Sequence, residues 1–157
     1  MIRIGITGHR ALPPGVDADV ADLLRAHLAP YGRAMVGLSC LADGADTAFA
    51  EAVLGAGAPL EVVVPASGYR ASLPAEHHDT YDRLLAGAAR IHDLGHTASS
   101  PEAHMAAGRL LVDRSDRLIA VWDGLPARGP GGTADVVAYA RSLSRPVTVL
   151  WPEGARR

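Results

Sequence analysis

Residues 129–141, GPGGTADVVAYAR, follow the apolar run RLIAVW at residues 117–122 and decide the fold class of this chain. The apolar run has the length and β-branched content of a buried strand, and the alanine-rich residues after Gly132 have a helical pattern. A strand that leads through a glycine-rich loop into a helix is typical of α/β proteins, in which helices connect parallel strands.

The glycine loop itself suggests an anion site. Backbone N–H groups at the start of a helix, next to residues without a Cβ and at the positive end of the helix dipole, favour a phosphate or carboxylate. Gly131, Gly132 and Thr133 would form its centre. The alternative is that the glycines turn the chain and Thr133 caps the helix.

The rest of the chain repeats the alternation of strand and helix. We predict an α/β fold, a three-layer Rossmann-like sandwich with a mostly parallel sheet and helices on both faces, formed by residues 1–157 as a single domain. The predicted strands are residues 2–7, 35–40, 60–65, 90–94, 117–122 and 146–151. The predicted helices are residues 16–28, 45–56, 77–89 and 133–143, with another that begins at Pro101.

Composition and charge narrow the function. The chain of 157 residues is 48% hydrophobic and 20% charged, which describes an ordinary globular protein, and no apolar stretch has the length of a membrane span. Its formal net charge of −2 gives no reason to expect nucleic acid. Cys40 is the single cysteine, so no intramolecular disulfide can form. A strand-like run follows Met1 directly, and we expect a cytoplasmic protein.

Loops with unusual chemistry follow four of the predicted strands. Because open parallel sheets bind ligands beyond the carboxyl ends of their strands, we expect the polar residues of these loops to converge on one cleft. The loop of Gly8, His9 and Arg10 has no G-x-G-x-x-G pattern, so an NAD-dependent dehydrogenase is unexpected. His9 and Arg10 are candidates for contact with a phosphate or a base.

The second loop contains Ser39, Gly44 and Asp46 as candidate ligand-binding residues. Gly44 would let the backbone approach a ligand. Asp46 begins a helix, and the simplest interpretation is that it and Asp43 cap that helix. If Asp46 contacts a ligand, a ribose hydroxyl, an amino group or Mg²⁺ fits its charge better than a phosphate does.

Three further side chains complete the candidate site. Tyr69 and Arg70 could close over a base by stacking, or they could be exposed loop residues. Asp123 follows the fifth strand and could contact a sugar or a base. His92 and His96 are four residues apart, but they straddle a predicted strand end and loop, so the helical geometry of a metal site does not apply and no metal and no cofactor are predicted.

Taken together, IGITGHR, GLSCLADGADTAFAEAVLGAG, LEVVVPASGYR, SDRLIAVWDG and GGTADVVAYAR resemble the SLOG superfamily of Rossmann-like proteins. This superfamily contains the Lonely Guy (LOG) phosphoribohydrolases, the DNA-processing protein A fold and sensors of nucleotide ligands. The resemblance covers residues 2–152 and implies a nucleotide-binding Rossmann-like fold.

The chain departs from the LOG enzymes at the residues that catalyse their reaction. Their P-G-G-x-G-T-x-x-E signature, aligned on Gly132 and Thr133, has Val136 in place of the glutamate and Asp135 one position early. Since one helical residue turns by about 100°, Asp135 would point elsewhere. Where those enzymes have an arginine this chain has Ala107, and Arg109 lies two residues away.

The leading hypothesis is therefore binding of a phosphate-bearing nucleotide or nucleotide-derived small molecule. The alternative is hydrolysis of a nucleoside monophosphate at its N-glycosidic bond, with Asp135, Asp46 or Asp123 as catalytic residue. A second alternative is single-stranded nucleic-acid binding, which the low aromatic content and the negative charge disfavour. Alongside the core face of the helix that begins at Pro101, a second stripe formed by His104, Met105, Arg109 and Val112 could pack against a neighbouring helix, and we expect a homodimer or higher homo-oligomer.

Overall fold

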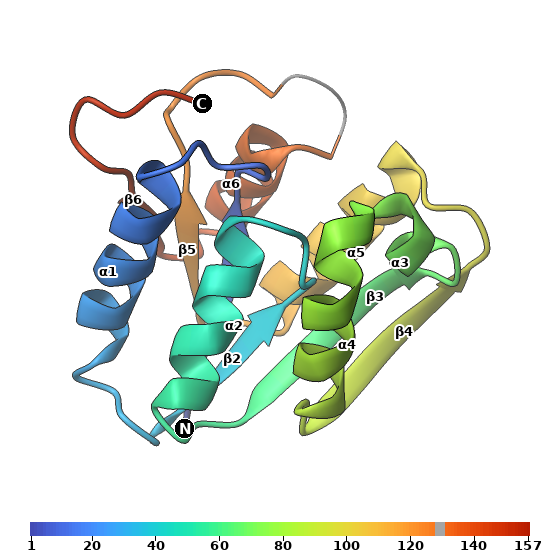
Figure 1. The fold of residues 1–157 in the computed structure, drawn as a ribbon, viewed down its shortest axis with the longest axis horizontal. Helices are drawn as coiled ribbons and strands as arrows, with labels where there is room; N and C mark the ends of the chain where they lie inside the picture. The colour runs from blue at the N-terminus through green and yellow to red at the C-terminus, as the bar shows by residue number, and fades with distance from the viewer. Residues whose placement is uncertain (128–130) are drawn as a thin grey trace.

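A computed structural model describes residues 1–127 and 131–157, and its centre is one sheet of six strands (Figure 1). The strands lie in the order β4-β3-β2-β1-β5-β6, and every neighbouring pair is parallel. Their bounds are β1 Ile2–Gly8, β2 Met35–Ser39, β3 Leu60–Ala66, β4 Arg90–His96, β5 Arg117–Val121 and β6 Val147–Leu150.

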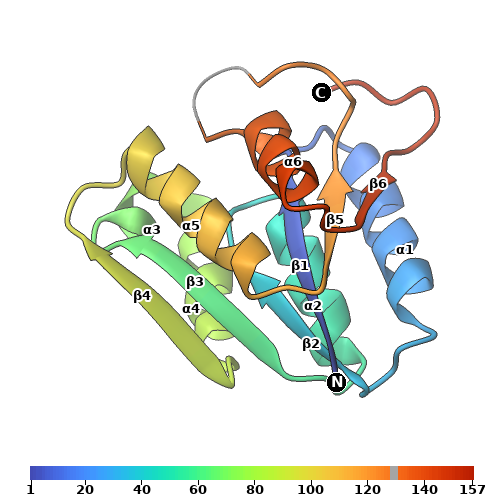
Figure 2. The ribbon, with the colours of Figure 1, turned by 180° about the vertical axis from the view of Figure 1, so that it is seen from behind.

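Helices cover both faces of the sheet. Helices α1, α2 and α4 lie on one face (Figure 1), and α5 and α6 lie on the other (Figure 2). This is the predicted three-layer α/β sandwich, and the sheet is parallel throughout. The helical bounds are α1 Val16–Leu28, α2 Ala45–Gly55, α3 Tyr69–Ser72, α4 His78–Ala86, α5 Pro101–Asp113 and α6 Thr133–Ser142, with a 3₁₀ turn at Ala75–His77 before α4.

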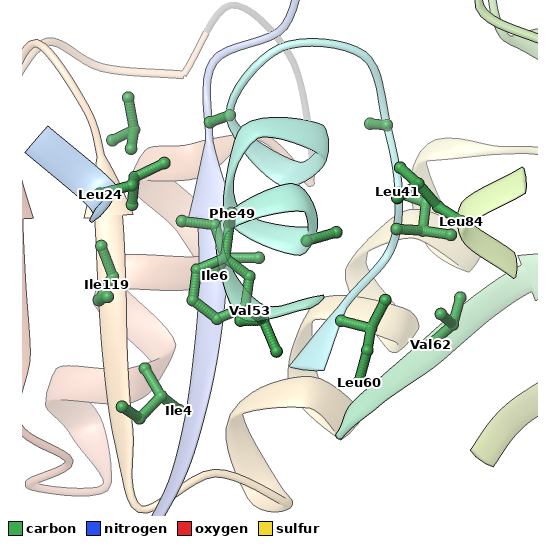
Figure 3. Packing of buried hydrophobic residues seen from close by; sticks show 14 of the residues in the cluster. Ile4, Ile6, Leu24, Leu41, Phe49, Val53, Leu60, Val62, Leu84 and Ile119 are labelled. Carbon is green, nitrogen blue, oxygen red and sulfur yellow. The ribbon is translucent and has the colours of Figure 1, made fainter. Parts of the chain in front are cut away.

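Two apolar layers hold these elements together. In the larger one, Ile4 and Ile6 of β1 pack with Phe49 and Val53 of α2 (Figure 3). Successive residues of a strand face opposite sides of the sheet, so Gly5, which lies between Ile4 and Ile6, faces α5. There Leu111 of α5 belongs to a second cluster, which also contains Leu38, Val63, Ala107, Val112, Leu118, Val136 and Ala140.

Glycine on the central strands lets the helices approach the sheet closely. A Cβ built on Gly37 of β2 would lie 2.6 Å from Cγ2 of Val53 and 3.1 Å from Cε1 of Phe49. The side chains of α2 therefore occupy the space that a larger residue at position 37 would need. On the opposite face a Cβ on Gly5 would meet Leu111 at 2.5 Å.

None of the described helices combines the length and the apolar character that crossing a bilayer requires.

The substitution Gly37→Ala is expected to lower the free energy of unfolding by about 1–3 kcal/mol, because the new methyl group overpacks the contact with α2. Gly55→Ala is the control. Position 55 ends α2 with no atom within 4 Å of a built Cβ, and alanine favours helix there by about 0.5–1 kcal/mol. Urea denaturation measures both variants, and equal stabilities would contradict this account of the packing.

Candidate functional site

A cavity of about 420 Å³ lies at the carboxyl ends of the strands, on the side of α5 and α6. Parallel pairing brings the loops after β1, β2, β3 and β5 to this one edge. Predicted site residues that line the cavity are Gly8, His9, Arg10, Asp46, Tyr69, Gly131, Gly132 and Thr133. Four others, Ser39, Gly44, Arg70 and Asp123, stay behind or outside its wall.

The floor of the cavity is apolar and its rim is polar. Ile6 of β1 and Leu111 of α5 form part of the floor together with Ala107, Gly108 and Val136. Polar groups enter from the loops around it. This combination suits a ligand with a flat apolar part and a few polar groups.

The start of α6 forms one side of the cavity. Gly131 has a φ of +80°, and a Cβ on it would meet the carbonyl oxygen of Pro101 at 3.0 Å, so the turn requires glycine. Its N–H donates to Oδ2 of Asp135 at 3.0 Å. Within residues 1–127 and 131–157 the N–H groups of Gly132 and Thr133 have no hydrogen-bond partner. Residues 129 and 130 of the predicted loop lie outside the described residues.

The Gly131 N–H therefore differs from its predicted role. We expected three backbone donors at this loop, but the carboxylate of Asp135 already occupies the first of them. Thr133 also does not cap α6. Gly132 is the N-cap residue, and no side chain caps the helix there.

The β1 loop packs tightly against its neighbours. A Cβ on Gly8 would lie 2.5 Å from Cβ of Ala45 and 2.9 Å from Cβ of Val121, so glycine lets α2 and β5 approach the end of β1. Next to it, His9 is buried with its ring edge-on to Trp151 at 5.4 Å. Arg10 reaches the cavity, but its Nε donates to Oδ1 of Asp43 at 2.8 Å.

Two predicted residues of the β2 loop support the site instead of lining it. Ser39 Oγ donates to the carbonyl oxygen of Asp46 at 3.0 Å and accepts the N–H of Leu41 at 3.1 Å. Gly44 has a φ of +90°, and a Cβ there would lie 2.6 Å from the carbonyl oxygen of His9. Gly44 thus lets two loops pack together, a different role from the predicted approach to a ligand.

Asp46 lines the cavity and is 9% exposed. Its Oδ2 accepts the N–H of Ala42 at 3.2 Å, so it stabilises the loop before α2 and does not cap that helix. Burial raises the pKa of Asp46 from 3.8 to about 7, against the lowering effect of the Ala42 N–H and of Arg10. Burial also raises the pKa of the neighbouring Cys40 thiol well above its usual value.

Tyr69 forms the wall at the β3 end. It begins α3, a single helical turn in a region predicted as loop, and its buried ring lies edge-on to His104 at 5.8 Å. This position differs from the predicted lid over a base. Arg70 points away from the cavity, with Nε and Nη2 each 2.8 Å from a carboxylate oxygen of Asp82.

The end of the chain adds a cation that the sequence reasoning missed. In the C-terminal tail, residues 151–157, Nε of Arg157 donates to Oδ2 of Asp123 at 2.6 Å, and the Arg157 side chain lines the cavity. Figures 1 and 2 show the tail beside the segment that follows β5. Burial alone would raise the pKa of Asp123, but hydrogen bonds from the Leu125 N–H, Arg157 and His9 hold it below its usual value.

His104 is a second cavity residue that was not predicted as a site residue from the sequence. It was assigned to a helix stripe, yet it lines the cavity from α5, and its Nε2 lies 2.7 Å from Oγ of Ser99. Burial lowers the pKa of His104. The helical spacing of the sequence predicted that His104 lies beside the core face of α5. It could not predict the contact with Tyr69, because that contact depends on where α3 lies.

The three candidate catalytic carboxylates occupy different places. Asp46 lines the cavity, while Asp123 is held behind it by Arg157. Asp135 lines a separate groove of about 450 Å³ between α5 and α6, on the other side of the Gly131 turn. Val136, at the position of the LOG glutamate, is buried, and its Cγ2 would lie 2.8 Å from a Cβ on Gly108 of α5.

Part of the predicted second stripe on α5 meets α6 of the same chain, which is the neighbouring helix that we expected for it. Val112 is fully buried in the second apolar cluster of this chain. Met105 and Arg109 line the groove, where the Arg109 guanidinium lies 5.6 Å from the ring centre of Tyr139. In the part of the chain that the structure describes, no group of three or more His, Cys, Asp or Glu side chains could hold a metal ion.

Comparison with solved structures shows the same fold in other proteins. DNA processing protein A from Helicobacter pylori, described with its single-stranded DNA binding mode, aligns with a TM-score of 0.72 and 20% identity over 99% of this chain and 67% of its own. The Streptococcus pneumoniae DNA processing protein A aligns with a TM-score of 0.71 and 17% identity, over 98% of this chain and 52% of its own. This chain thus spans about half of that protein.

A third structure is the molybdenum cofactor binding protein from Rippkaea orientalis, with a TM-score of 0.63 and 20% identity over 94% of this chain and 75% of its own. These likenesses confirm the predicted resemblance at the level of the fold. No protein-family model matches the sequence, and no curated protein matches it either.

Asp46→Asn is expected to change how stability depends on pH. The folded pKa of Asp46, about 7, lies above its unfolded value near 3.8, so the folded chain binds more protons between these values. Its contribution to the free energy of unfolding therefore falls as pH rises from about 4 to about 7. Asparagine does not titrate, so the variant lacks this fall.

Urea denaturation at pH 5 and at pH 8 measures the effect. The wild-type protein should lose about 1–3 kcal/mol more than the variant between the two pH values. An equal change in both proteins would show that the pKa of Asp46 is not raised.

Proposed function

We propose that the cavity at the carboxyl ends of the strands binds a phosphate-bearing nucleotide or a nucleotide-derived small molecule. The observation that carries this proposal is the pair of backbone N–H donors at Gly132 and Thr133. They lie at the N-terminus of α6, a helix of ten residues, and line the cavity. A helix N-terminus that adjoins a cavity with an apolar floor suits a ligand with an anionic group and a ring.

The charges around the cavity support a phosphate at the α6 end. Arg157 lines the cavity there. Its Nε donates to Asp123 and its Nη2 donates to the carbonyl oxygen of Pro126. Arg10 also lines the cavity from the β1 loop. Asp46, the carboxylate that lines the cavity, comes instead from the loop after β2. In the sheet, β1 lies between β2 and β5, and both β1 and β5 lie between β2 and β6.

The similar structures are consistent with a ligand of this class. One is a binding protein for the molybdenum cofactor, and another binds single-stranded DNA. For this chain the small molecule fits better than a nucleic-acid strand. Strand binding usually combines stacked aromatic platforms with a basic groove, whereas this chain has 4% aromatic residues and a net charge of −2.

Binding without glycosidic hydrolysis is the second part of the proposal. Such hydrolysis needs a carboxylate placed to support a positively charged transition state or to activate water. Val136 can do neither, and Asp135 turns its carboxylate to the Gly131 N–H. Asp46 is the candidate carboxylate that remains in the cavity.

We also propose that the chain acts in the cytoplasm as a homodimer or higher homo-oligomer. The half-buried side chains of Met105 and Tyr139 line the groove between α5 and α6, and we expect a second copy of the chain to pack there. Sedimentation equilibrium measures the oligomeric state.

A nucleotide ligand should raise the melting temperature. Free ligand at about a hundred times its Kd stabilises the fold by about 2.7 kcal/mol, which corresponds to a rise of several degrees for a domain of this size. The screen contains mononucleotides, cyclic nucleotides and ADP-ribose-like compounds. The absence of a shift with every one of them would contradict the proposal.

Gly132→Val should abolish the shift, because its side chain would occupy the phosphate's space. Position 132 has a φ of −73° and a ψ of 176°, which valine adopts readily, so the variant should still fold. Gly55→Val is the matched control, since a Cβ there has open space at the far end of α2. A Gly132→Val protein that keeps the full shift would place the phosphate elsewhere.

The native protein should release no free adenine from AMP above a no-protein control, as measured by liquid chromatography. Clear release would overturn the second part of the proposal. In that case Asp46→Asn and Asp135→Asn identify the carboxylate, because each substitution keeps the shape of the side chain and removes its charge.

A further inference from the structure

We propose, on the basis of the proposed nucleotide function, that Asp46 determines base specificity by accepting a hydrogen bond from the exocyclic amino group of the ligand's ring. The ligand class is then an amino-bearing nucleobase or a related nitrogen heterocycle with a phosphate. This role goes beyond general nucleotide binding, because it assigns the choice between ligands to the amino group on their ring.

The first observation is that one oxygen of Asp46 is committed and the other is available. Oδ2 accepts the N–H of Ala42 at 3.2 Å, which fixes the side chain. Among the described residues Oδ1 has no partner. No fully buried side-chain oxygen or nitrogen there lacks one, so solvent reaches Oδ1. Because the residue is 9% exposed and lines the cavity, the cavity is the space into which Oδ1 opens.

The second observation is that no cation of residues 1–127 or 131–157 forms an ion pair with this carboxylate. The charge of Arg10 acts on Asp46, but Nε of Arg10 donates to Oδ1 of Asp43 at 2.8 Å. The other groups that act on Asp46 or respond to it are Asp43, the Cys40 thiol and the Tyr69 hydroxyl. Burial of most of the carboxylate costs free energy, and a ligand N–H that bonds to Oδ1 offsets part of that cost.

The third observation is the place of Asp46 relative to the anion donors. It enters the cavity from the end of β2, whereas Gly132 and Thr133 follow β5, and β1 lies between those strands. A negatively charged oxygen repels a phosphate and accepts from an amino group. The two ends of the cavity therefore match the two ends of a nucleotide, with the apolar floor of Ile6 and Leu111 between them.

The test measures the Kd of three pairs of 5′-monophosphates that differ by one amino group. The pairs are AMP with purine riboside monophosphate, GMP with IMP, and CMP with pyrimidin-2-one riboside monophosphate. At pH 8, where the Asp46 carboxyl is ionised, at least one amino-bearing member should bind tenfold or more tightly than its partner, as measured by calorimetry. Asp46→Asn should reduce that ratio to below about twofold. If the amide oxygen of Asn accepts the Ala42 N–H, its NH₂ group faces the ligand's amino group, and two donors cannot form a hydrogen bond.

Asp22→Asn is the matched control, because Asp22 pairs with Arg25 on the exposed face of α1 and should leave the ratio unchanged. A second measurement needs no folded variant at position 46. In the wild-type protein the amino preference should fall at pH 5.5, where the carboxyl is protonated. If Asp46→Asn folds, it serves as the reference for this arm, since it keeps His9 and His104 of the cavity.

Two results separate this inference from the function on which it rests. Ratios within twofold for all three pairs, or a preference that Asp46→Asn retains, would overturn the role of Asp46 and leave nucleotide binding intact. Failure of all six compounds to bind would overturn the proposed nucleotide function, and the role of Asp46 with it.

Discussion

Close packing of the loops after β1 and β2 is the constraint on which the cavity depends. Gly8 lets Ala45 and Val121 approach the end of β1, and Gly44 turns the β2 loop onto the carbonyl oxygen of His9. The N–H of Ala45 then donates to that same oxygen at 3.2 Å. Without room for these contacts the first turn of α2 could not reach the edge of the sheet, and Asp46 would not enter the cavity.

The opposite end of the strands is fixed by charge. Arg3 on β1 reaches over β2 to form two hydrogen bonds with the carboxylate of Glu61, at 3.0 and 2.9 Å. His92 of β4 lies 2.7 Å from the same carboxylate. The hydrogen bonds from Arg3, with a smaller effect from His92, lower the pKa of Glu61 to about 2. The network ties β1, β3 and β4 together at the end of the sheet opposite the cavity.

Much of the fold could be predicted from the sequence, because apolar periodicity reports directly which residues face the core. The helix at residues 16–28 and the start of the helix at Pro101 were predicted as the structure has them. Helix α3 was missed because a single turn of four residues is too short to show an apolar period, and its buried residue, Tyr69, is its first.

The candidate site was harder to predict, because residue type does not reveal what a side chain meets in space. Gly44 was assigned to a ligand, but it serves the contact between two loops. Asp46 was interpreted as a cap, but it accepts the N–H of Ala42 and lines the cavity. Arg157 carried no signal, since one arginine at a chain end resembles any other until the distance to Asp123 is known.

The central claim is that one ligand spans the cavity from the start of α6 to the β2 loop. Titration of the ¹⁵N-labelled protein with AMP, followed by amide chemical shifts, tests it most directly. The account predicts concerted shifts at Gly132, Thr133 and Asp46 with a common Kd. Shifts confined to the groove between α5 and α6, at Met105 and Tyr139, would contradict it.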